Sequence, residues 1–258
     1  MLWYAGCVNA GRTARERVRA ELIREITEIA RRQLATDGAA GLSLRAVARE
    51  MGMVSSAIYR YFPSRDDLLT TLIIDGYNAV GAAVEKAEAA CPAEDYPGRW
   101  LAACRAVRAW ALAHPHEYAL VYGSPVPGYR APEQTIAPAA RAAAVFGKII
   151  GDAYRARVSG APGPATKQAG LTVPGSPVPV PPVPGSFVPD AARLRDAILA
   201  GVPDEVAAAG LIAWSGLFGL VSFELFGQFE NVIGQDPADR DAFFTECVTR
   251  WAAQIGIA

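Results

Sequence analysis

The spacing of apolar residues predicts that most of this chain is helical. In residues 13–37, apolar side chains recur every three to five positions, with charged residues between them. They are Val18, Leu22, Ile26, Ile29 and Leu34. This period follows one face of an amphipathic helix, and Gly38 and Gly41 predict that the helix ends there.

The remaining patterns are also helical. Similar segments cover residues 44–51, 55–61, 66–90, 97–113, 115–122, 133–157, 190–200, 204–231 and 237–255. Prolines separate several of them, and no segment sustains the two-residue alternation that indicates a half-buried strand. The sequence therefore predicts an all-α fold.

Residues 159–189 interrupt this pattern. They hold 9 of the 19 prolines in the chain, including the run PGSPVPVPPVPGSFVP. Proline lacks a backbone N–H and fixes φ, so the segment is incompatible with a helix or a central strand. We expect an extended surface loop of polyproline character. The alternative is a docking segment for an aromatic-lined groove on a partner.

Residues 43–62, SLRAVAREMGMVSSAIYRYF, carry the most specific local pattern. Two short helices around Gly52, with the small Ala48 at their crossing, predict a helix-turn-helix. The apolar side chains expected to face inward are Val47, Ile58 and Phe62. Those expected on or near the outward side are Ser55, Ser56, Tyr59, Arg60 and Tyr61. The N-terminal end of such a second helix enters the major groove of DNA.

The charge distribution agrees with this interpretation. The 258 residues are 52% hydrophobic and 20% charged, which is typical of a soluble globular protein. The formal net charge is −1, yet residues 11–65 hold 11 arginines and no lysine against 6 acidic residues. Residues 66–258 hold 14 basic and 20 acidic residues. We call residues 11–65 the head and residues 66–258 the body. A basic head and an acidic body predict that only the head binds a polyanion.

The run GLSLRAVAREMGMVSSAIYRYFPSRDDLL resembles the DNA-binding domain of TetR/AcrR-type transcriptional regulators. The YxYF ending of the second short helix and the following helix, capped by Ser64, make this resemblance specific. It implies a helix-turn-helix DNA-binding domain at residues 12–65 and a ligand-binding and dimerisation domain at residues 66–258. We expect residues 1–11 to be a flexible tail.

The resemblance implies DNA contacts by eight residues. They are Ser43, Arg45, Ser55, Ser56, Tyr59, Arg60, Tyr61 and Arg65. Ser43 and Arg45 would touch the phosphate backbone, and Ser55 and Ser56 lead the reading helix. Tyr59, Arg60 and Tyr61 would reach phosphates or base edges. Arg65, or the backbone beside it, would hold a phosphate. The alternatives are core packing for Tyr59 and Tyr61 and solvated charges for Arg60 and Arg65. Val54, where many members carry Ser, Thr or Pro, weakens the cap of the reading helix.

Residues 204–231 predict a buried helix of the second domain. Its apolar face consists of Ala207, Leu211, Trp214, Phe218, Val221, Leu225 and Phe229. Small residues beside this face would let another helix approach closely, one from a second chain. The segment and residues 114–129 resemble the regulatory domain of a TetR subgroup marked by a Trp-x-x-x-His/Phe-Gly signature. In the family the last two helices pair with those of a partner, which implies a homodimer. The dimer contacts expected on residues 204–231 and 237–255 are Ala208, Ser215, Gly219, Ser222, Phe244 and Trp251.

The family resemblance also implies an effector cavity in the second domain. The residues expected to line it are Trp100, Cys104, Val107, Trp110, Tyr118, Tyr122, Phe146, Trp214 and Phe218. This set is apolar with phenolic and indole donors, which suits a mostly hydrophobic small molecule with a few polar groups. The alternative for each residue is ordinary core packing.

Other residue types carry no stronger chemistry. The cysteines Cys7, Cys91, Cys104 and Cys247 are scattered, which favours free thiols, with a 91–104 pair as the alternative. We expect His114 and His116 to cap or pack against a helix rather than to bind a metal. Glu224 lies within an apolar run, so we expect it to pair with a residue across the bundle or, as the alternative, to face a ligand. We predict no metal and no cofactor.

The sequence therefore predicts a dimeric, ligand-responsive transcriptional regulator, a repressor acting on an inverted-repeat operator. The alternative is a helical small-molecule-binding protein without specific operator binding. No G-x-S-x-G, Gly-rich phosphate loop or H-E-x-x-H motif indicates an enzyme. No window reaches about 18 uninterrupted apolar residues, so we expect no membrane partner. The free thiols predict a reducing, cytoplasmic location.

Overall fold

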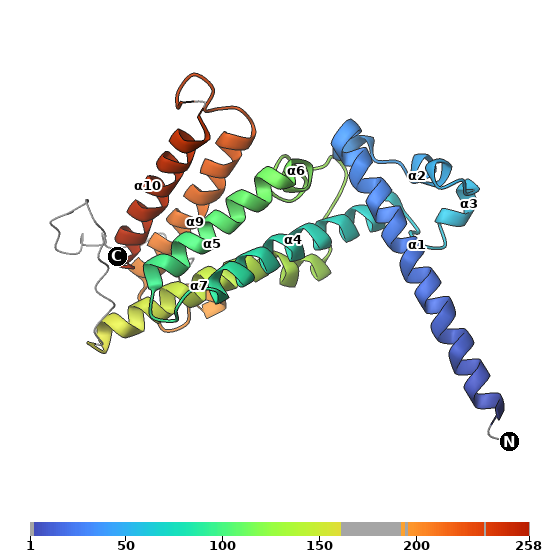
Figure 1. Cartoon of the computed structure of the whole chain (residues 1–258), viewed down its shortest axis with the longest axis horizontal. Helices are drawn as coiled ribbons and strands as arrows, with labels where there is room; N and C mark the ends of the chain where they lie inside the picture. Colours follow the sequence, from blue (N-terminus) through green and yellow to red (C-terminus); the bar gives the residue numbers. More distant parts are fainter. Residues whose placement is uncertain (1–2, 161–191, 194–195, 235, 258) are drawn as a thin grey trace. The chain divides into compact units, whose positions relative to one another are not determined.

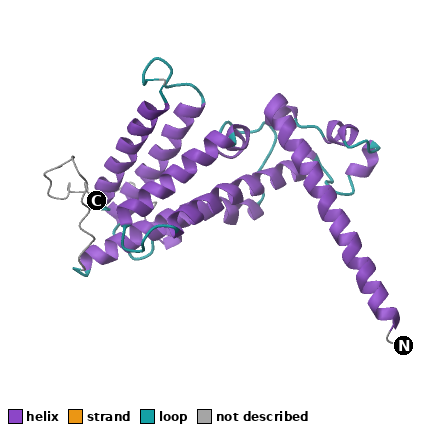
Figure 2. Ribbon diagram, in the orientation of Figure 1, coloured by secondary structure: helices purple, strands orange, loops and turns teal. Residues whose placement is uncertain are grey.

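The computed structural model describes residues 3–160, 192–193, 196–234 and 236–257. Every regular element among these residues is a helix, which confirms the all-α fold (Figure 2). The elements are α1 (Trp3–Gly41), α2 (Leu44–Glu50), α3 (Ser55–Ile58), α4 (Arg65–Ala89), α5 (Tyr96–Ala113), α6 (Pro115–Tyr122), the 3-10 helix η1 (Glu133–Thr135), α7 (Ile136–Val158), α9 (Asp204–Leu225) and α10 (Pro237–Ile255), as labelled in Figure 1.

The chain forms two compact units. The first unit consists of Met1–Gly76 and His116–Thr135, and the second consists of Tyr77–Pro115 and Ile136–Ala258. The boundary therefore falls inside α4, beyond residue 65, where the sequence placed the end of the DNA-binding domain. Residues 116–135 belong to the first unit rather than to the second. The division into functional domains at residues 12–65 and 66–258 stays a prediction.

Helix α1 starts earlier than the sequence predicts. It begins at Trp3, within the segment expected as a tail, because residues 3–12 contain no proline and only Gly6 and Gly11 oppose a helix. At the other end, Gly38 has a φ of 67° and breaks the helical geometry, as expected for a glycine at that place.

The first unit is built around a core of apolar side chains from α1, α2, α3 and α4. The fully buried members include Ile26, Ala30, Val47, Ile58 and Leu68. Ser64 caps α4, because its hydroxyl accepts a hydrogen bond from the Asp67 N–H at 3.2 Å.

The second unit packs α5 against α7, α9 and α10. The indole N–H of Trp100 in α5 donates to the Val248 carbonyl of α10 at 2.9 Å. Helices α9 and α10 approach closely at Gly216, where a Cβ would lie 2.5 Å from the Trp251 ring. Glycine at this position lets the indole lie directly on the α9 backbone.

The sequence predicted that α9 would continue to residue 231, but the helix ends at Leu225. Gly227 and Asn231 follow with φ values of 77° and 63°, which a continuous helix does not allow. By length and composition alone α9 is also apolar enough to cross a membrane, contrary to the expectation of no such segment. One side of α9 packs against α5 and α10, while Ile212 and Phe223 are exposed.

The predicted proline-rich loop falls outside the described residues except for Ser159 and Gly160. The predicted helix at 190–200 is described in part, and residues 192–193 and 196–198 are helical. Among the described cysteines, Cys91, Cys104 and Cys247 are free thiols. The 91–104 disulfide that the sequence left open as an alternative is not formed in this structure. Burial raises the pKa of the Cys104 thiol well above its ordinary value.

Candidate nucleic-acid interface

The turn between α2 and α3 depends on Gly52. This residue has a φ of 67°, a left-handed conformation that favours glycine. The Gly52 N–H donates to the Arg49 carbonyl at 3.1 Å, and the Met53 N–H donates to the Ala48 carbonyl at 2.8 Å. The predicted turn between the two short helices is thereby confirmed.

The helix pair separates apolar from polar side chains as predicted. Val47, Ala48 and Ile58 have no exposed surface, and Phe62 is 5% exposed. The exposed side chains of the pair include Arg45, Ser55, Ser56, Tyr59 and Arg60. We call these five residues the α2–α3 surface. Its hydroxyl groups and guanidinium groups are donors suited to phosphate oxygens and base edges.

The start of α3 lacks a side-chain cap. Val54 occupies the N-cap position with extended backbone, makes no side-chain hydrogen bond and is 71% exposed. The α-helical part of α3 is correspondingly short, and the chain continues through Tyr61 as hydrogen-bonded turns. The sequence expected a helix through residue 61.

Ser43 fixes the start of α2. Its hydroxyl accepts a hydrogen bond from the Ala46 N–H at 3.4 Å, and its own N–H donates to the Gln33 side chain of α1 at 3.3 Å. The residue is half-buried. It therefore holds α2 on α1 in addition to any contact with DNA.

Arg65 has a role inside the domain that the sequence did not predict. Its guanidinium donates to the carbonyls of Leu42 at 3.1 Å and Ala39 at 2.6 Å, near the kinked end of α1. It also lies 3.8 Å from the Asp66 carboxylate. The side chain ties the start of α4 to the end of α1, so it is engaged where a phosphate contact was expected.

Tyr61 is half-buried and packs against the apolar core of the head, which agrees with the alternative interpretation of this residue. The guanidinium carbon of Arg19 lies 5.3 Å from the centre of the Tyr61 ring, and Arg19 donates to the Arg60 carbonyl at 3.3 Å. Sequence reasoning missed Arg19. Its position could have indicated this contact, because Arg19 lies four residues before Ile23 and therefore on the side of α1 that packs against the core.

Comparison with known proteins agrees with this geometry. Residues 26–72 match the model of bacterial regulatory proteins of the tetR family, and residues 100–251 match that of the tetracyclin repressor-like C-terminal domain. The chain is 39% identical over 230 residues to the HTH-type transcriptional regulator Rv1816 of Mycobacterium tuberculosis, covering 89% of this chain and 90% of that protein. The match to regulator Mb1846 of Mycobacterium bovis has the same identity and coverage.

The chain belongs to the TetR family. It is thus a helix-turn-helix transcriptional regulator and not an enzyme. Among solved structures, a protein described as regulatory, SCO4313, is similar with a TM-score of 0.69 and 31% identity, covering 92% of this chain and 97% of that one. A Rhodococcus protein of unknown function has a TM-score of 0.61 at 23% identity, covering 89% and 93%, and shows the likeness of fold.

The residues expected to form an effector cavity are divided between the units of this TetR-family protein. Tyr118 and Tyr122 lie in the first unit, and their ring centres are 5.2 Å apart. The other seven lie in the second unit. Of these, Trp100, Cys104, Val107, Trp110 and Phe146 are at most 6% exposed. Most of the predicted lining is therefore packed core, because the aromatic side chains fill the space between the helices.

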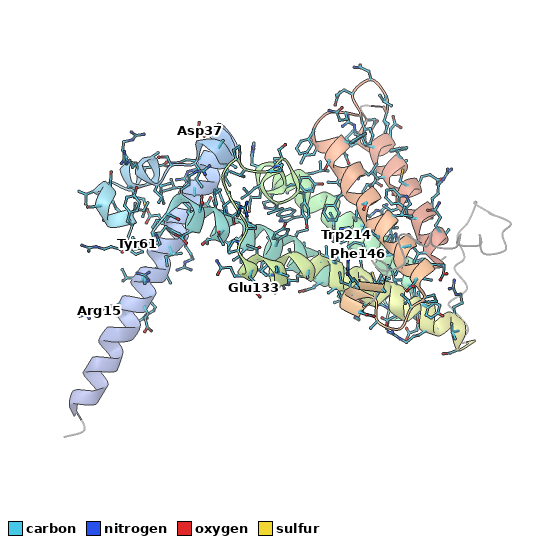
Figure 3. The ribbon with its side chains drawn as sticks, turned by 180° about the vertical axis from the view of Figure 1, so that it is seen from behind. Arg15, Asp37, Tyr61, Glu133, Phe146 and Trp214 are labelled. Atoms are coloured by element: carbon cyan, nitrogen blue, oxygen red, sulfur yellow. The ribbon has the colours of Figure 1, made fainter. Side chains whose placement is uncertain are left out.

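Phe146 and Trp214 do line a small pocket. It has a volume of about 100 Å³ and also includes Leu211, Gly147 and Gly210. Figure 3 shows Phe146 and Trp214 next to each other, with ring centres 5.5 Å apart in an edge-to-face arrangement. Trp100 and Phe218 extend this aromatic series on its two sides. Elsewhere in the unit, the indole N–H of Trp110 is buried without an acceptor among the described residues.

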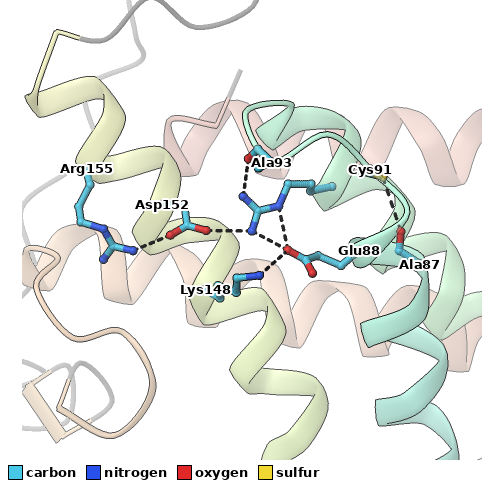
Figure 4. A network of polar contacts seen from close by, with 8 residues as sticks. Ala87, Glu88, Cys91, Ala93, Lys148, Asp152 and Arg155 are labelled. Atoms are coloured by element: carbon cyan, nitrogen blue, oxygen red, sulfur yellow. Dashed lines mark hydrogen bonds and ion pairs between the residues drawn. The ribbon is translucent and has the colours of Figure 1, made fainter.

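A larger polar groove of about 640 Å³ lies where α4, α5 and α7 come together. Arg99 donates to Glu88 at 2.6 Å, to Asp152 at 2.9 Å and to the Ala93 carbonyl at 2.8 Å (Figure 4). Lys148 and Arg155 complete the network on Glu88 and Asp152. The network's charged groups are paired with one another, so it ties three helices together.

The carboxylate of Glu88 is stabilised by this network. Burial alone would raise its pKa, but hydrogen bonds from Lys148 and Arg99 lower the pKa below its ordinary value. The pKa of Cys91, at the edge of the same groove, is shifted in the opposite direction. Burial and the nearby acids Asp95 and Glu88 raise the pKa of its thiol, which keeps it protonated at neutral pH.

Glu224 and His114 have structural partners. Arg108 of α5 donates to both carboxylate oxygens of Glu224 at 2.7 Å, which agrees with the expected partner across the bundle. His114 ends α5, and its ring stacks on Trp110 at 5.5 Å between centres. No group of three metal-ligating side chains occurs in the part of the chain that the structure describes.

The expected dimer residues divide into exposed and buried ones. Ser215 and Gly219 are exposed on α9, and Ala208 and Ser222 are half-buried. Phe244 is 1% exposed and lies in the subunit's own core beneath Arg108, so the single chain presents no Phe244 surface to a partner. Trp251 is half-buried against Gly216.

The exposed residues of α9 form one strip along the helix, with an apolar side chain at each end and small residues between them. Ile212 is 64% exposed and Phe223 is 54% exposed, and Ser215 and Gly219 lie between them at helical spacing. We call these four residues the α9 outer face. A Cβ added to Gly219 would meet no described atom within 4 Å, so the subunit itself leaves this position open.

Proposed function

We propose that this TetR-family regulator is a repressor that binds an inverted-repeat operator as a homodimer and is released by a mostly hydrophobic small molecule. The observation that carries the proposal is the α2–α3 surface, where exposed hydroxyl and guanidinium groups stand on a buried, well-packed helix pair. A protein that only bound small molecules would have no use for this arrangement.

The eight predicted DNA residues fall into two groups in this proposal. Arg45, Ser55, Ser56, Tyr59 and Arg60 contact phosphates or base edges directly. Ser43, Tyr61 and Arg65 act mainly by holding α2, α3 and α4 in position, since each makes the internal contacts described above.

The α9 outer face supports the dimer. Exposed apolar residues at helical spacing, with Gly219 at their centre, suit close packing against the same face of a second chain. A twofold dimer holds two reading helices at a fixed distance. Half-sites about 34–36 Å apart, or multiples of this, then form an inverted repeat.

The apolar pocket at Phe146 and Trp214 supports a hydrophobic effector, and the sequence subgroup with the Trp-x-x-x-His/Phe-Gly signature is consistent with such a regulatory domain. A pocket of about 100 Å³ is smaller than the roughly 300 Å³ that drug-sized ligands occupy. The effector therefore favours a conformer with a wider pocket and lower operator affinity. A ligand shifts a population only if it binds the two conformers differently. The protein acts in the cytoplasm, where its operator lies.

An electrophoretic mobility shift with the DNA that flanks the gene tests this function. We expect a specific complex at nanomolar protein, resistant to excess scrambled duplex, and its loss on adding an effector from a panel of hydrophobic compounds. Equal affinity for flanking and scrambled duplexes would favour the alternative of a small-molecule-binding protein.

A further inference from the structure

The amino-terminal part of α1 is not covered by the rest of its own unit. Every described side chain from residue 14 to residue 21 is exposed, whereas α1 joins the core from Ile26 onward. Figure 1 shows this part of the helix continuing past α2 and α3 within the first unit. Packing against the head therefore does not explain why the chain keeps a helix here.

This stretch is strongly basic. Residues 12–19 contain four arginines and one acidic residue, Glu16. Arginine binds phosphate oxygens with two parallel hydrogen bonds and keeps its charge at all physiological pH values. The charge pattern complements a nucleic-acid backbone rather than an apolar protein surface.

Arg19 connects the stretch to the α2–α3 surface. It donates to the Arg60 carbonyl, and its guanidinium lies over the ring of Tyr61. Arg15 lies four residues earlier, on the same face of α1 and about 6 Å further along the axis. Figure 3 shows Arg15 on the part of α1 that extends beyond Tyr61. The face that carries Arg19 and Arg15 is thus continuous with the reading helix.

We propose that this face of α1 is a second DNA-contacting element, in which Arg15 binds the phosphate backbone of the duplex flanking the bases read by α3. This inference rests on the proposed operator binding. The contact adds affinity without base specificity, because phosphates are the same at every sequence. It also predicts that the operator footprint extends beyond the half-site.

The test uses the full-length protein and a fluorescently labelled operator duplex, with affinity measured by anisotropy across a range of salt concentrations. Arg15→Ala should lower the slope of log K against log salt by about one and weaken binding about fivefold at physiological salt. The loss should be equal on scrambled duplex. Arg15→Glu should have a larger effect in the same direction.

Arg17→Ala is the matched control. It removes the same charge from the same exposed stretch, but two residues along a helix places it on nearly the opposite face. We expect it to change the salt slope by much less than Arg15→Ala does. Equal effects of the two variants would overturn the assignment of this face.

Duplex length gives an independent readout. Shortening the operator to the half-sites alone should weaken wild-type binding and leave Arg15→Ala unaffected. If the wild type prefers its operator and Arg15→Ala binds it with unchanged affinity and slope, this inference fails and the proposed function stands. If Arg15→Ala changes the oligomeric state in sedimentation instead, a second copy of the chain occupies this face and the inference also fails. Absence of any operator preference in the wild type contradicts the proposed function itself.

Discussion

Two exposed faces of the chain differ in chemistry, and the difference indicates their partners. The α2–α3 surface in the first unit carries hydroxyl and guanidinium groups on a helix pair whose inner side is fully buried. The α9 outer face in the second unit carries Ile212 and Phe223 around Gly219. A polar, cationic surface suits a polyanion, and exposed large apolar side chains beside small residues suit another protein surface. The proposed function accordingly assigns DNA to the α2–α3 surface and a second copy of the chain to the α9 outer face.

The largest expected effect comes from Gly219→Arg on the α9 outer face. The subunit has room for a side chain here, so the fold should survive. In a dimer the charged side chain would fill the crossing between the two chains. We expect a monomer in sedimentation velocity and operator affinity reduced by about 10² to 10⁴, because two-headed binding is lost.

Gly219→Ala is the control for this variant, since it adds a small apolar group at the same open position. It should remain a dimer with nearly normal operator affinity. A Gly219→Arg protein that sediments as a dimer at micromolar concentration would move the interface elsewhere.

Substitutions in the α2–α3 surface should have the next largest effect. Arg60→Ala and Tyr59→Ala should each weaken operator binding by about 10- to 100-fold, as expected for loss of a phosphate or base contact. Arg60→Ala should also lower the salt slope by about one. Dimerisation and helicity by circular dichroism should not change. Unchanged operator affinity in both variants would remove α3 from the interface.

The buried network in the body gives a smaller, pH-dependent effect on stability. Glu88→Gln removes the charge that Arg99 and Lys148 share, so the free energy of unfolding should fall by about 2 kcal/mol at pH 7. The pKa of Glu88 is lowered in the folded state, so its contribution exists above the ordinary glutamate pKa and disappears as pH falls below it. The difference in melting temperature between the wild type and Glu88→Gln should therefore stay constant from pH 7 to about pH 5 and shrink as the pH falls below the ordinary glutamate pKa toward about pH 3. A difference that stays constant over this whole range would show that the charge of Glu88 is not responsible.

The smallest effect should come from Gly216→Ala, three residues before Gly219 on α9. A Cβ here would lie 2.5 Å from Trp251, so the two helices must move apart slightly. We expect a loss of stability of about 1 kcal/mol, seen in urea unfolding, with the dimer and operator binding kept. Together with Gly219→Ala, this variant separates packing inside the subunit from packing between subunits. Equal stability of the two alanine variants would contradict the close approach of α9 and α10.

The head was predictable from its sequence to the level of single side chains. A left-handed Gly52, a small Ala48 and inward Val47 and Ile58 follow from local spacing, because the two short helices lie next to each other in the chain. Prediction failed where contacts join distant segments. Arg65 reaches the Ala39 carbonyl, 26 residues away, and nothing in the local pattern indicates that bond.

The body was predictable only in outline. Apolar spacing located α5, α7 and α10, and it suggested that Glu224 has a partner, which is Arg108. It did not distinguish a pocket wall from packed core, since Trp100 and Phe146 have the same residue types in either role. Phe243 and Phe244 are adjacent aromatics on α10, 39% and 1% exposed respectively. The register of α10 against its neighbours decides which of these two side chains points outward.

The stoichiometry and affinity of the complex with an inverted-repeat operator test the central claim most directly. The operator half-sites would first be located by footprinting the DNA that flanks the gene. Sedimentation of the wild type with the whole inverted repeat should then show two chains per duplex, and a single half-site should bind at least about 100-fold more weakly. One chain per duplex, with equal affinity for the half-site and the inverted repeat, would contradict the account.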